Sequence, residues 1–313
     1  MNIRTYRPGD EAAQTAIYNE AAADLPRFKP ASLEEVNRRH RARDFDPDAR
    51  FFAEVDGRPV GYATFHANGR VNFPWCRTGH EQAAGPLFQR ILQAMRDRRL
   101  KSAFAAYRSD WTAQKDFFQA HGFELVREMV NFVLDPADMP TRPGRRSNPL
   151  TALRREDIPA LFEMGANVIR SPTPQELEQH LFKNPYFPPD SLFVLRSRTD
   201  DSPLAVGILV TDLTYADPNQ VDAAMPCFRL GAFGTEGMQT KRLNGLFSFL
   251  SKDQRSVSPL ALDLLGHATF QLEEAGGGGS LAAQVPSDVS YLLRFYHSYF
   301  RRQGSFPIFE RAL

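Results

Sequence analysis

The fold of this chain is decided by residues 71–107, whose sequence is VNFPWCRTGHEQAAGPLFQRILQAMRDRRLKSAFAAY. Residues 71–75 favour a strand, and the stretch from Gly85 to Arg99 predicts an amphipathic helix with a proline in its first turn. Residues 100–107 then return to a strand pattern. A strand, a helix and a second strand in this order form a crossover, and a crossover joins parallel strands. We therefore expect parallel strands near 71–76 and 102–107.

The rest of the first half surrounds this crossover. Apolar residues at helical spacing predict a helix over residues 10–23, and strands follow at 51–55 and 60–67 around an Asp-Gly turn. After the crossover comes a helix that Gly122 closes, and then an extended stretch at 123–135. The pattern predicts an α/β fold built on a mixed sheet.

A break in the pattern divides the chain. Between Asp135 and Leu150 the sequence PADMPTRPGRRSNP is rich in proline and arginine and can form neither a helix nor a central strand. We expect two domains, residues 1–137 and 148–313, joined by a linker at 138–147.

The second half repeats the order of elements. We expect a helix near 157–169, strands at 191–195, 204–213 and 227–233, a helix at 242–252, a strand at 280–285 and a helix at 288–303. The strands near 227–233 and 281–285 should form the parallel pair of this half. The residues that match between the halves are, in chain order, Arg7 and Asp10 with Arg154 and Asp157; Val60-Gly61 with Val206-Gly207; Pro74, Arg77 and Gly79 with Pro226, Arg229 and Gly231; Gln82 and Gly85 with Arg242 and Gly245; and Ser109-Asp110 and Phe117-Phe118 with Ser287-Asp288 and Phe295-Tyr296.

Composition narrows the class of protein. The 38 Lys and Arg residues nearly balance the 37 Asp and Glu residues, so the net charge of +1 does not favour binding to nucleic acid or to anionic membranes. The two cysteines, Cys76 and Cys227, are too few for a disulfide scaffold or a zinc cluster. The sequence shows no signal peptide and no membrane span, and we expect a cytoplasmic protein without a metal. The sequence does not predict the oligomeric state.

This order of elements resembles that of the GCN5-related N-acetyltransferases, and the chain resembles a two-domain member of that family. The resemblance implies that the two crossover strands diverge at one end, where the family binds acetyl-CoA. It also implies a turn, [Gln/Arg]-x-x-Gly-x-[Gly/Ala], that holds the pyrophosphate at a helix N-terminus through unpaired backbone N–H groups.

Each half contains a partial match to that turn. In the first half Gln82 and Gly85 match, but Leu87 takes the small position and Pro86 removes an N–H donor. In the second half Arg242, Leu243, Asn244 and Gly245 would form the turn, with Leu230 and Gly231 on the preceding strand. A glycine that merely serves the chain turn is the alternative in both places.

The resemblance also implies a proton donor for the departing thiolate, usually a tyrosine on the last helix. Tyr296 matches this position, whereas its first-half counterpart, Phe118, has no hydroxyl. Tyr296 as a core aromatic is the alternative. A general base is not singled out among Asp212, Asp222, His66 and His80.

We therefore expect an acetyl-CoA-dependent N-acyltransferase that acts on a small amine, with its site in the second half. The alternative is a non-catalytic pair of such domains that binds a small molecule or a partner. A repeat-built α/β binding protein of another class is a third possibility, and it would lack the diverging strands.

Overall fold

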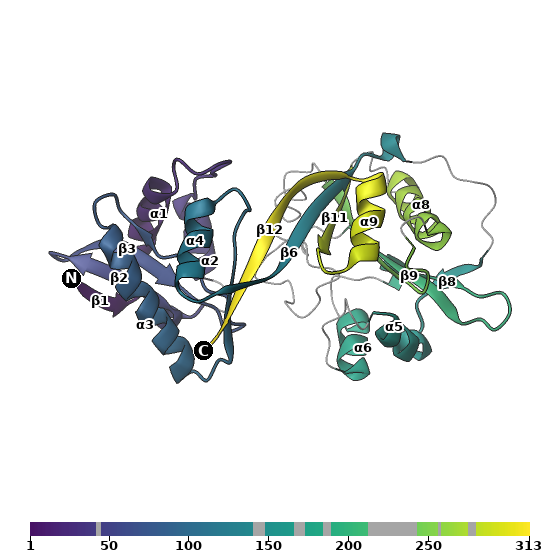
Figure 1. The fold of residues 1–313 in the computed structure, drawn as a ribbon, viewed down its shortest axis with the longest axis horizontal. Coiled ribbons are helices and arrows are strands. Elements are labelled where there is room, and N and C mark those ends of the chain that lie inside the picture. The colour runs from purple at the N-terminus through teal and green to yellow at the C-terminus, as the bar shows by residue number, and fades with distance from the viewer. Residues whose placement is uncertain are drawn as a thin grey trace. The chain divides into compact units, whose positions relative to one another are not determined.

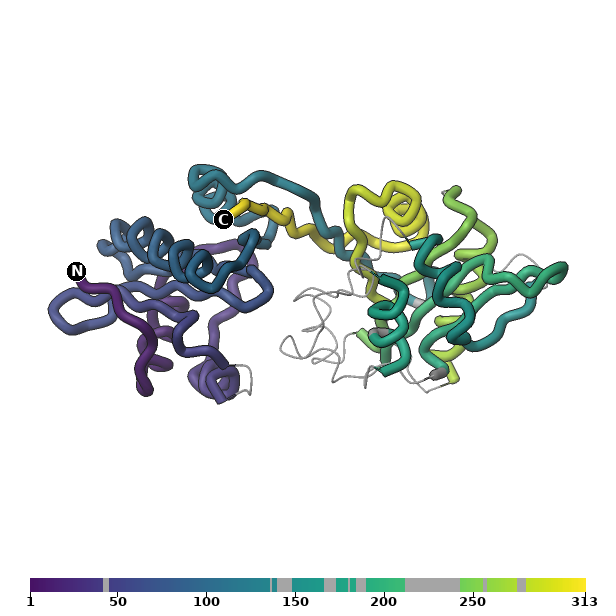
Figure 2. The backbone as a smooth tube through the Cα atoms, turned by 90° about the horizontal axis from the view of Figure 1, so that it is seen from below, coloured from purple at the N-terminus to yellow at the C-terminus, as the bar shows by residue number. Residues whose placement is uncertain are grey.

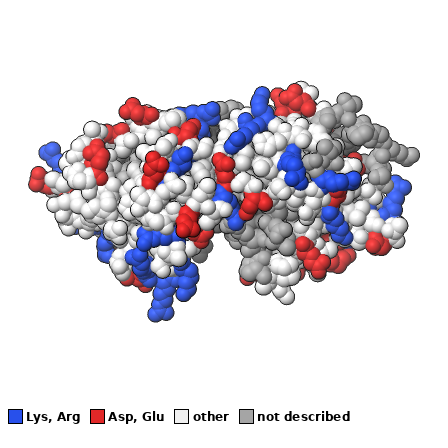
Figure 3. Space-filling view, viewed as in Figure 1, with Lys and Arg blue, Asp and Glu red and all other residues white. Residues whose placement is uncertain are grey.

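The structure is a computed structural model that describes residues 1–41, 45–139, 148–165, 173–183, 189–211, 243–255, 258–274 and 280–313 (Figure 1). The chain forms two compact units. Unit 1 contains Met1–Arg127 together with Phe306–Leu313, and unit 2 contains Glu128–Ser305. Acidic and basic side chains are interspersed on the face drawn in Figure 3.

Unit 1 begins with an antiparallel sheet whose strand order is β1-β2-β3-β4. Its elements are β1 (Asn2–Thr5), α1 (Asp10–Ala21), α2 (Leu33–His40), β2 (Arg50–Val55), β3 (Arg58–Thr64), β4 (Trp75–Cys76), α3 (Ala84–Asp97), β5 (Ser102–Ala106) and α4 (Thr112–Ala120). The expected helices of the first half are present, as are the strands expected at 51–55, 60–67, 100–107 and 123–135. The strand expected at 71–75 is reduced to Trp75–Cys76, and β1 and α2 were not predicted.

The crossover helix α3 packs one apolar face against this sheet. Leu87, Phe88, Ile91, Leu92 and Met95 recur at helical spacing and are all 0% exposed. Burial of each such side chain contributes roughly 1.5 to 3 kcal/mol before the entropy of ordering is subtracted. The helix is therefore held by the sheet, as the period of its sequence predicts.

The crossover of unit 1 is parallel, as predicted. Arg70 and Phe104 form a parallel bridge, in which the Val71 N–H donates to the Phe104 carbonyl at 2.9 Å and the Phe104 N–H donates to the Gly69 carbonyl at 2.8 Å. Beyond this bridge β4 pairs with β3, whereas β5 pairs with the last strand of the chain. The two strands therefore diverge.

Unit 2 repeats this plan in a larger mixed sheet. Its elements are β7 (Leu150–Ala152), α5 (Ile158–Met164), α6 (Pro174–Phe182), β8 (Leu192–Arg196), β9 (Pro203–Val210), β10 (Leu243–Ser251), α8 (Pro259–Glu274), β11 (Ser280–Pro286) and α9 (Ser290–Tyr299). No helix in the described part of the chain is both long enough and apolar enough to span a membrane.

One predicted element of unit 2 is wrong. Residues 242–252 were expected to form a helix, but Leu243–Ser251 is the strand β10, which pairs with β9 along six residues. Its apolar, aromatic-rich sequence LNGLFSFLS suits a strand that is buried on both faces. The crossover helix of this unit is α8, which was not predicted. The strand expected at 227–233 lies outside the described residues. Its expected parallel pairing with residues 281–285 is wrong, because the neighbours of β11 in the sheet are β10 and β6 (Glu124–Leu134).

The crossover of unit 2 is also parallel. Leu243, Gly245 and Leu246 of β10 pair with Ser280, Leu281 and Ala282 of β11. Beyond Leu246 β10 continues along β9 to Ser251, while β11 continues along another strand to Pro286. The pair therefore opens after Leu246 and Ala282, so the strands diverge in this unit as well.

Two strands pass from one unit to the other. Strand β6 (Glu124–Leu134) supplies Met129–Leu134 as the partner of β11 in unit 2, and strand β12 (Arg301–Ala312) supplies Ile308–Ala312 as the partner of β5 in unit 1. In Figure 2 the yellow C-terminal segment accordingly lies with unit 1. The compact units therefore differ from the expected ranges 1–137 and 148–313, because each unit takes a strand from the other half of the sequence. The last helix ends at Tyr299, not at residue 303 as expected, and β12 follows it.

Candidate functional site at the diverging strands

The duplication is visible in the way each unit starts its first helix. In unit 1 the Asp10 carboxylate accepts the Arg7 N–H at 2.6 Å, and in unit 2 the Asp157 carboxylate accepts the Arg154 N–H at 2.8 Å. These are the Arg and Asp pairs that the sequence matched. In each unit the aspartate closes the turn that precedes the first helix, because its carboxylate accepts the N–H of the residue three positions earlier.

An arginine holds each of these aspartates by two hydrogen bonds. Arg4 reaches Asp10 at 2.7 and 2.8 Å, and Arg196 reaches Asp157 at 2.9 and 2.6 Å. Burial by itself raises the pKa of Asp157, but the hydrogen bonds from Arg196 and from the Arg154 N–H, together with the charges of both arginines, outweigh it and hold that pKa below its usual value. The carboxylate therefore stays ionised in the interior.

Sheet register fixes which residues of the two units are equivalent. In unit 1 Gly61 of β3 pairs with Cys76 and Tyr62 pairs with Trp75, whereas in unit 2 Gly207 of β9 pairs with Phe249 and Ile208 pairs with Ser248. Placing Gly61 on Gly207, as the sequence match does, makes Trp75 equivalent to Ser248 and Cys76 equivalent to Phe249.

The same spacing relocates the second turn. Counting from Cys76 and Phe249, the segment Gln82-x-x-Gly85-Pro86-Leu87 corresponds to Arg255-x-x-Ser258-Pro259-Leu260, and both segments lead into the crossover helix. The two Pro-Leu pairs are the sequence signal that could have found this match. The predicted turn at Arg242 to Gly245 lies one strand too early.

Gly245 is a glycine for a packing reason. A Cβ atom at this position of β10 would lie 2.8 Å from Leu209 and 3.3 Å from Leu272 and Leu281. Leu243 and Asn244 belong to the same strand, so none of the three begins a helix. Leu230, Gly231 and Arg242 lie outside the described residues, as do Asp212 and Asp222.

The start of α8 carries a cation and a capping serine. Ser258 is 1% exposed, its carbonyl accepts the Leu262 N–H at 3.1 Å, and its hydroxyl lies 3.4 Å from the Ala261 nitrogen. Arg255 is exposed and binds the Asp253 carboxylate at 2.7 and 2.9 Å, which lowers the pKa of Asp253 to about 2. This helix end therefore offers an arginine beside a partly satisfied set of backbone donors.

In the corresponding turn of unit 1 a carboxylate already accepts a backbone hydrogen bond. The Glu81 carboxylate accepts the Gly79 N–H at 2.9 Å, and backbone hydrogen bonds lower the pKa of Glu81. Gln82 is exposed, and a Cβ atom on Gly85 would have nothing within 4 Å. The Glu81 carboxylate thus takes one backbone N–H at this turn, whereas the carboxylate near the start of α8, Asp253, is paired with Arg255.

Tyr296 lies where the strands of unit 2 open. Its hydroxyl donates to the Phe247 carbonyl at 3.2 Å, one residue beyond the last pair between β10 and β11. The ring is 1% exposed and stacks on Phe132 with centroids 5.8 Å apart. In unit 1 the equivalent Phe118 is 0% exposed and packs on Phe88. Only the unit 2 member of this pair carries a proton that can be transferred.

The two histidines considered as bases both belong to unit 1. His66 is exposed next to the turn before β4, and the buried Nδ1 of His80 has no hydrogen-bond partner among the described residues. Neither belongs to the unit that carries Tyr296.

Comparisons with known proteins agree with this architecture. No family model matches the chain. Two mycothiol acetyltransferases, from Acidothermus cellulolyticus and Thermomonospora curvata, are 44% and 40% identical to it over 63 residues, 20% of this chain. The chain spans about a fifth of the length of these curated relatives, 19% and 21% respectively.

Solved structures match over nearly the whole chain. A GCN5-related N-acetyltransferase from Sphaerobacter thermophilus covers 99% of this chain and 95% of its own with a TM-score of 0.62 at 15% identity. A tandem protein of the same fold from the clavulanic acid biosynthesis pathway covers 99% and 98% with a TM-score of 0.53 at 10% identity. A glucosamine N-acetyltransferase region of a fungal β-N-acetylglucosaminidase covers 99% of this chain and 38% of its own with a TM-score of 0.65 at 14% identity. The chain has the tandem GCN5-related N-acetyltransferase fold.

Proposed function

We propose that this protein is an acetyl-CoA-dependent N-acyltransferase that acts on a small amine and that its reaction takes place in unit 2. The observation that carries the proposal is the opening between β10 and β11, with the Tyr296 hydroxyl bonded to the first carbonyl beyond it. The local identity to two mycothiol acetyltransferases supports the same class of reaction.

The residues at this opening fit the acyl arm of acetyl-CoA. Backbone groups alternate along a strand, so Phe249 directs its N–H and C=O to the same edge of β10 as Phe247. No strand pairing to β11 is described at that edge beyond Leu246. The edge can therefore hold an extended chain that carries amide groups.

The phosphate end would be held at the start of α8. Arg255 and the N–H of Leu260 would bind it there. Pro259 has no N–H, and the Ala261 N–H already donates to the Ser258 hydroxyl. When bound, acetyl-CoA supplies an acyl group on a thiolate, which leaves as the amine attacks. Tyr296 holds a proton at its phenol oxygen, and its burial keeps water from that proton.

Unit 1 is the poorer candidate because it lacks these groups. Phe118 replaces the tyrosine, and Glu81 already occupies the Gly79 N–H. We therefore assign acyl transfer to unit 2 alone.

The test is acetyl transfer by the full chain to a panel of small primary amines, with Tyr296→Phe as the variant. Loss of a general acid lowers the rate by about 10²–10⁴-fold, while acetyl-CoA binding measured by calorimetry should change little. Tyr299→Phe, on the same helix and half-buried, is the matched control and should retain the rate. An unchanged rate in Tyr296→Phe contradicts the assignment.

The non-catalytic alternative has one observation in its favour. The Tyr296 hydroxyl is buried and already donates to a backbone carbonyl, as a purely structural tyrosine does. Acetyl-CoA binding without transfer to any amine of the panel would favour this alternative.

A further inference from the structure

A side chain bridges the opening between the diverging strands of unit 1. Beyond the parallel pair of Arg70 and Phe104, the Phe73 N–H donates to the Tyr107 hydroxyl oxygen at 2.5 Å. Tyr107 follows directly after β5, whereas Phe73 lies on the segment that leads into β4. A phenol oxygen therefore takes a backbone donor at the point where the two strands separate.

Aromatic rings surround this hydrogen bond. Tyr107 stacks on Trp111 and on Phe118, with ring centroids 5.8 Å apart in both pairs. Phe73 contacts Trp75 edge to face, with centroids 5.0 Å apart. The residues at the opening of unit 1 thus form one continuous group of packed rings.

Phe73 and Tyr107 also join the two apolar cores of unit 1. One core contains residues of α3 and α4, such as Leu87 and Phe118, and the other contains residues of α1, such as Ile17. Phe73 and Tyr107 pack against both cores. Since a packed core continues through the opening, an extended chain has no room between these strands.

Unit 2 has smaller residues at the positions of these rings. Phe104 is equivalent to Ser280, because their partners across the crossover lie five positions before Trp75 and its match. Counting onward from these two residues gives the counterpart of Tyr107, and the two Ser-Asp pairs give the counterpart of Trp111. The corresponding residues are Phe73 and Leu246, Trp75 and Ser248, Tyr107 and Ala283, and Trp111 and Val289.

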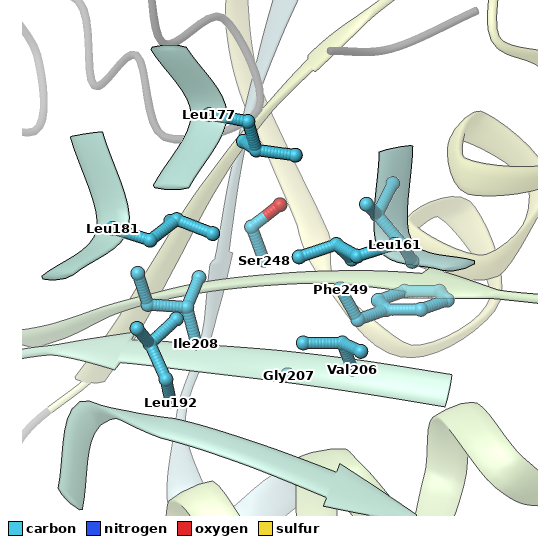
Figure 4. A pocket seen from close by; sticks show the side chains of 10 residues that line it. Leu161, Leu177, Leu181, Leu192, Val206, Gly207, Ile208, Ser248 and Phe249 are labelled. Carbon is cyan, nitrogen blue, oxygen red and sulfur yellow. The ribbon is translucent and has the colours of Figure 1, made fainter. Parts of the chain in front are cut away.

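Aliphatic side chains replace the group of rings on one face of the unit 2 sheet. In Figure 4 Ser248 lies among Leu161, Leu177 and Leu181 of α5 and α6. Ala283 ends in a methyl group, which has no oxygen to bind a backbone N–H. Within its described residues, unit 2 therefore has no counterpart of the Tyr107 bridge.

We propose that Tyr107 closes unit 1 to the acyl arm of acetyl-CoA, so that the chain binds one acetyl-CoA molecule, in unit 2. The proposal rests on the proposed function and adds the residue that makes the two units differ in ligand binding. An arm that entered unit 1 would have to break the hydrogen bond to Phe73 and displace the ring from Trp111 and Phe118. Tyr107 therefore acts by occupying both a donor and a space that the arm requires.

The experiment titrates the full chain with acetyl-CoA, followed by calorimetry and by tryptophan fluorescence. The two tryptophans of the chain, Trp75 and Trp111, contact Phe73 and Tyr107 respectively, so their emission reports on the opening of unit 1. The intact chain should bind one acetyl-CoA without a change in emission. Two sites in the intact chain, or an emission change that saturates with acetyl-CoA, would overturn the closure.

Variants of Tyr107 locate the effect. Tyr107→Ala removes the ring and the oxygen, so calorimetry should detect a second, weaker site and the emission should change as that site fills. Tyr107→Leu is a milder variant for the same test if the alanine variant does not fold. Tyr107→Phe is the matched control, because its ring still fills the opening and unit 1 should stay closed. A single site with unchanged emission in the folded alanine or leucine variant would overturn the role of Tyr107.

The readouts separate this proposal from the proposed function. Acetyl-CoA binding that appears only in the alanine or leucine variant supports the closure and refutes the site in unit 2. Two sites in the intact chain refute the closure, and loss of transfer in Tyr296→Phe would then still place the reaction in unit 2. Absence of binding in every form refutes both proposals.

Discussion

The two units share one arrangement of helices and strands, and they differ at three residue positions of the proposed site. Both have an aspartate that closes the turn before the first helix, a parallel crossover and strands that diverge. Where unit 1 has Trp75 and Phe118, unit 2 has Ser248 and Tyr296. At the turn before the crossover helix, Gln82 of unit 1 corresponds to Arg255 of unit 2. The two units have kept the same arrangement of strands, while the residues of the proposed site differ between them.

The largest expected effect comes from deleting Phe306–Leu313. Unit 1 then loses the burial of Ile308 and Phe309 and the partner of β5. We expect unit 1 to lose about 3 to 6 kcal/mol of stability from the two side chains alone. Both tryptophans of the chain, Trp75 and Trp111, belong to unit 1, so a denaturant titration followed by tryptophan fluorescence reports on this unit.

The control for the deletion is Glu310→Ala. Glu310 is exposed on β12, so its replacement should change the free energy of unfolding of unit 1 by no more than about 0.5 kcal/mol. A deleted chain whose tryptophan transition matches that of the intact chain would show that β12 is dispensable for unit 1.

The second effect compares Asp157 and Asp10, each of which is bound by an arginine. Asp157→Asn leaves the 2% exposed Arg196 side chain without its buried counter-charge and should cost about 3 to 5 kcal/mol. Asp10→Asn should cost less, because Arg4 retains Glu54 at 2.7 Å. Thermal unfolding followed by circular dichroism of both variants measures the difference, and equal losses would contradict the role given to Glu54.

The ion pair of Asp157 and Arg196 should make the free energy of unfolding depend on pH in the acid range. The pKa of Asp157 is below its unfolded value, so its contribution is complete above that unfolded value of about 3.9 and is lost as pH falls through the folded pKa. A pH series of unfolding free energies should therefore fall less steeply below about pH 4 in Asp157→Asn than in the wild-type chain.

The smallest effects should be opposite in sign at two glycines. Gly245→Ala places a Cβ atom 2.8 Å from Leu209, and the displacement of that side chain should cost about 1 to 3 kcal/mol. Gly85→Ala meets no atom within 4 Å and lies in α3, so it should stabilise unit 1 by about 0.5 kcal/mol. Chemical denaturation of the two variants checks both signs. A stabilising Gly245→Ala would contradict the packing account.

The sequence predicted the elements whose signals are local. The period of α3 and the Arg-x-x-Asp pairs were sufficient for the crossover and the repeat. The prediction failed at residues 242–252, where a match to a short motif took precedence over the strand pattern of Leu243–Ser251. The equivalence of Trp75 and Ser248 depends on sheet register. Counting forward from β9 cannot give that register because an insertion separates β9 from β10, and only the Pro-Leu pairs at the start of the crossover helices carry the match in the sequence. The exchange of β6 and β12 has no local signal either, since a strand does not encode its partner.

The position of β12 also affects the order in which the protein can mature. The ribosome completes Met1–Arg127 early, yet Ile308–Ala312, which closes the edge of β5, is synthesised only after the whole of Glu128–Ser305. At about 5–20 residues per second, the nascent chain carries this open edge for on the order of ten seconds or more. An unpaired strand edge attracts other chains during that interval. Slow translation of the second half, or a stop codon before Phe306, should therefore cause aggregation that starts in the first half of the protein.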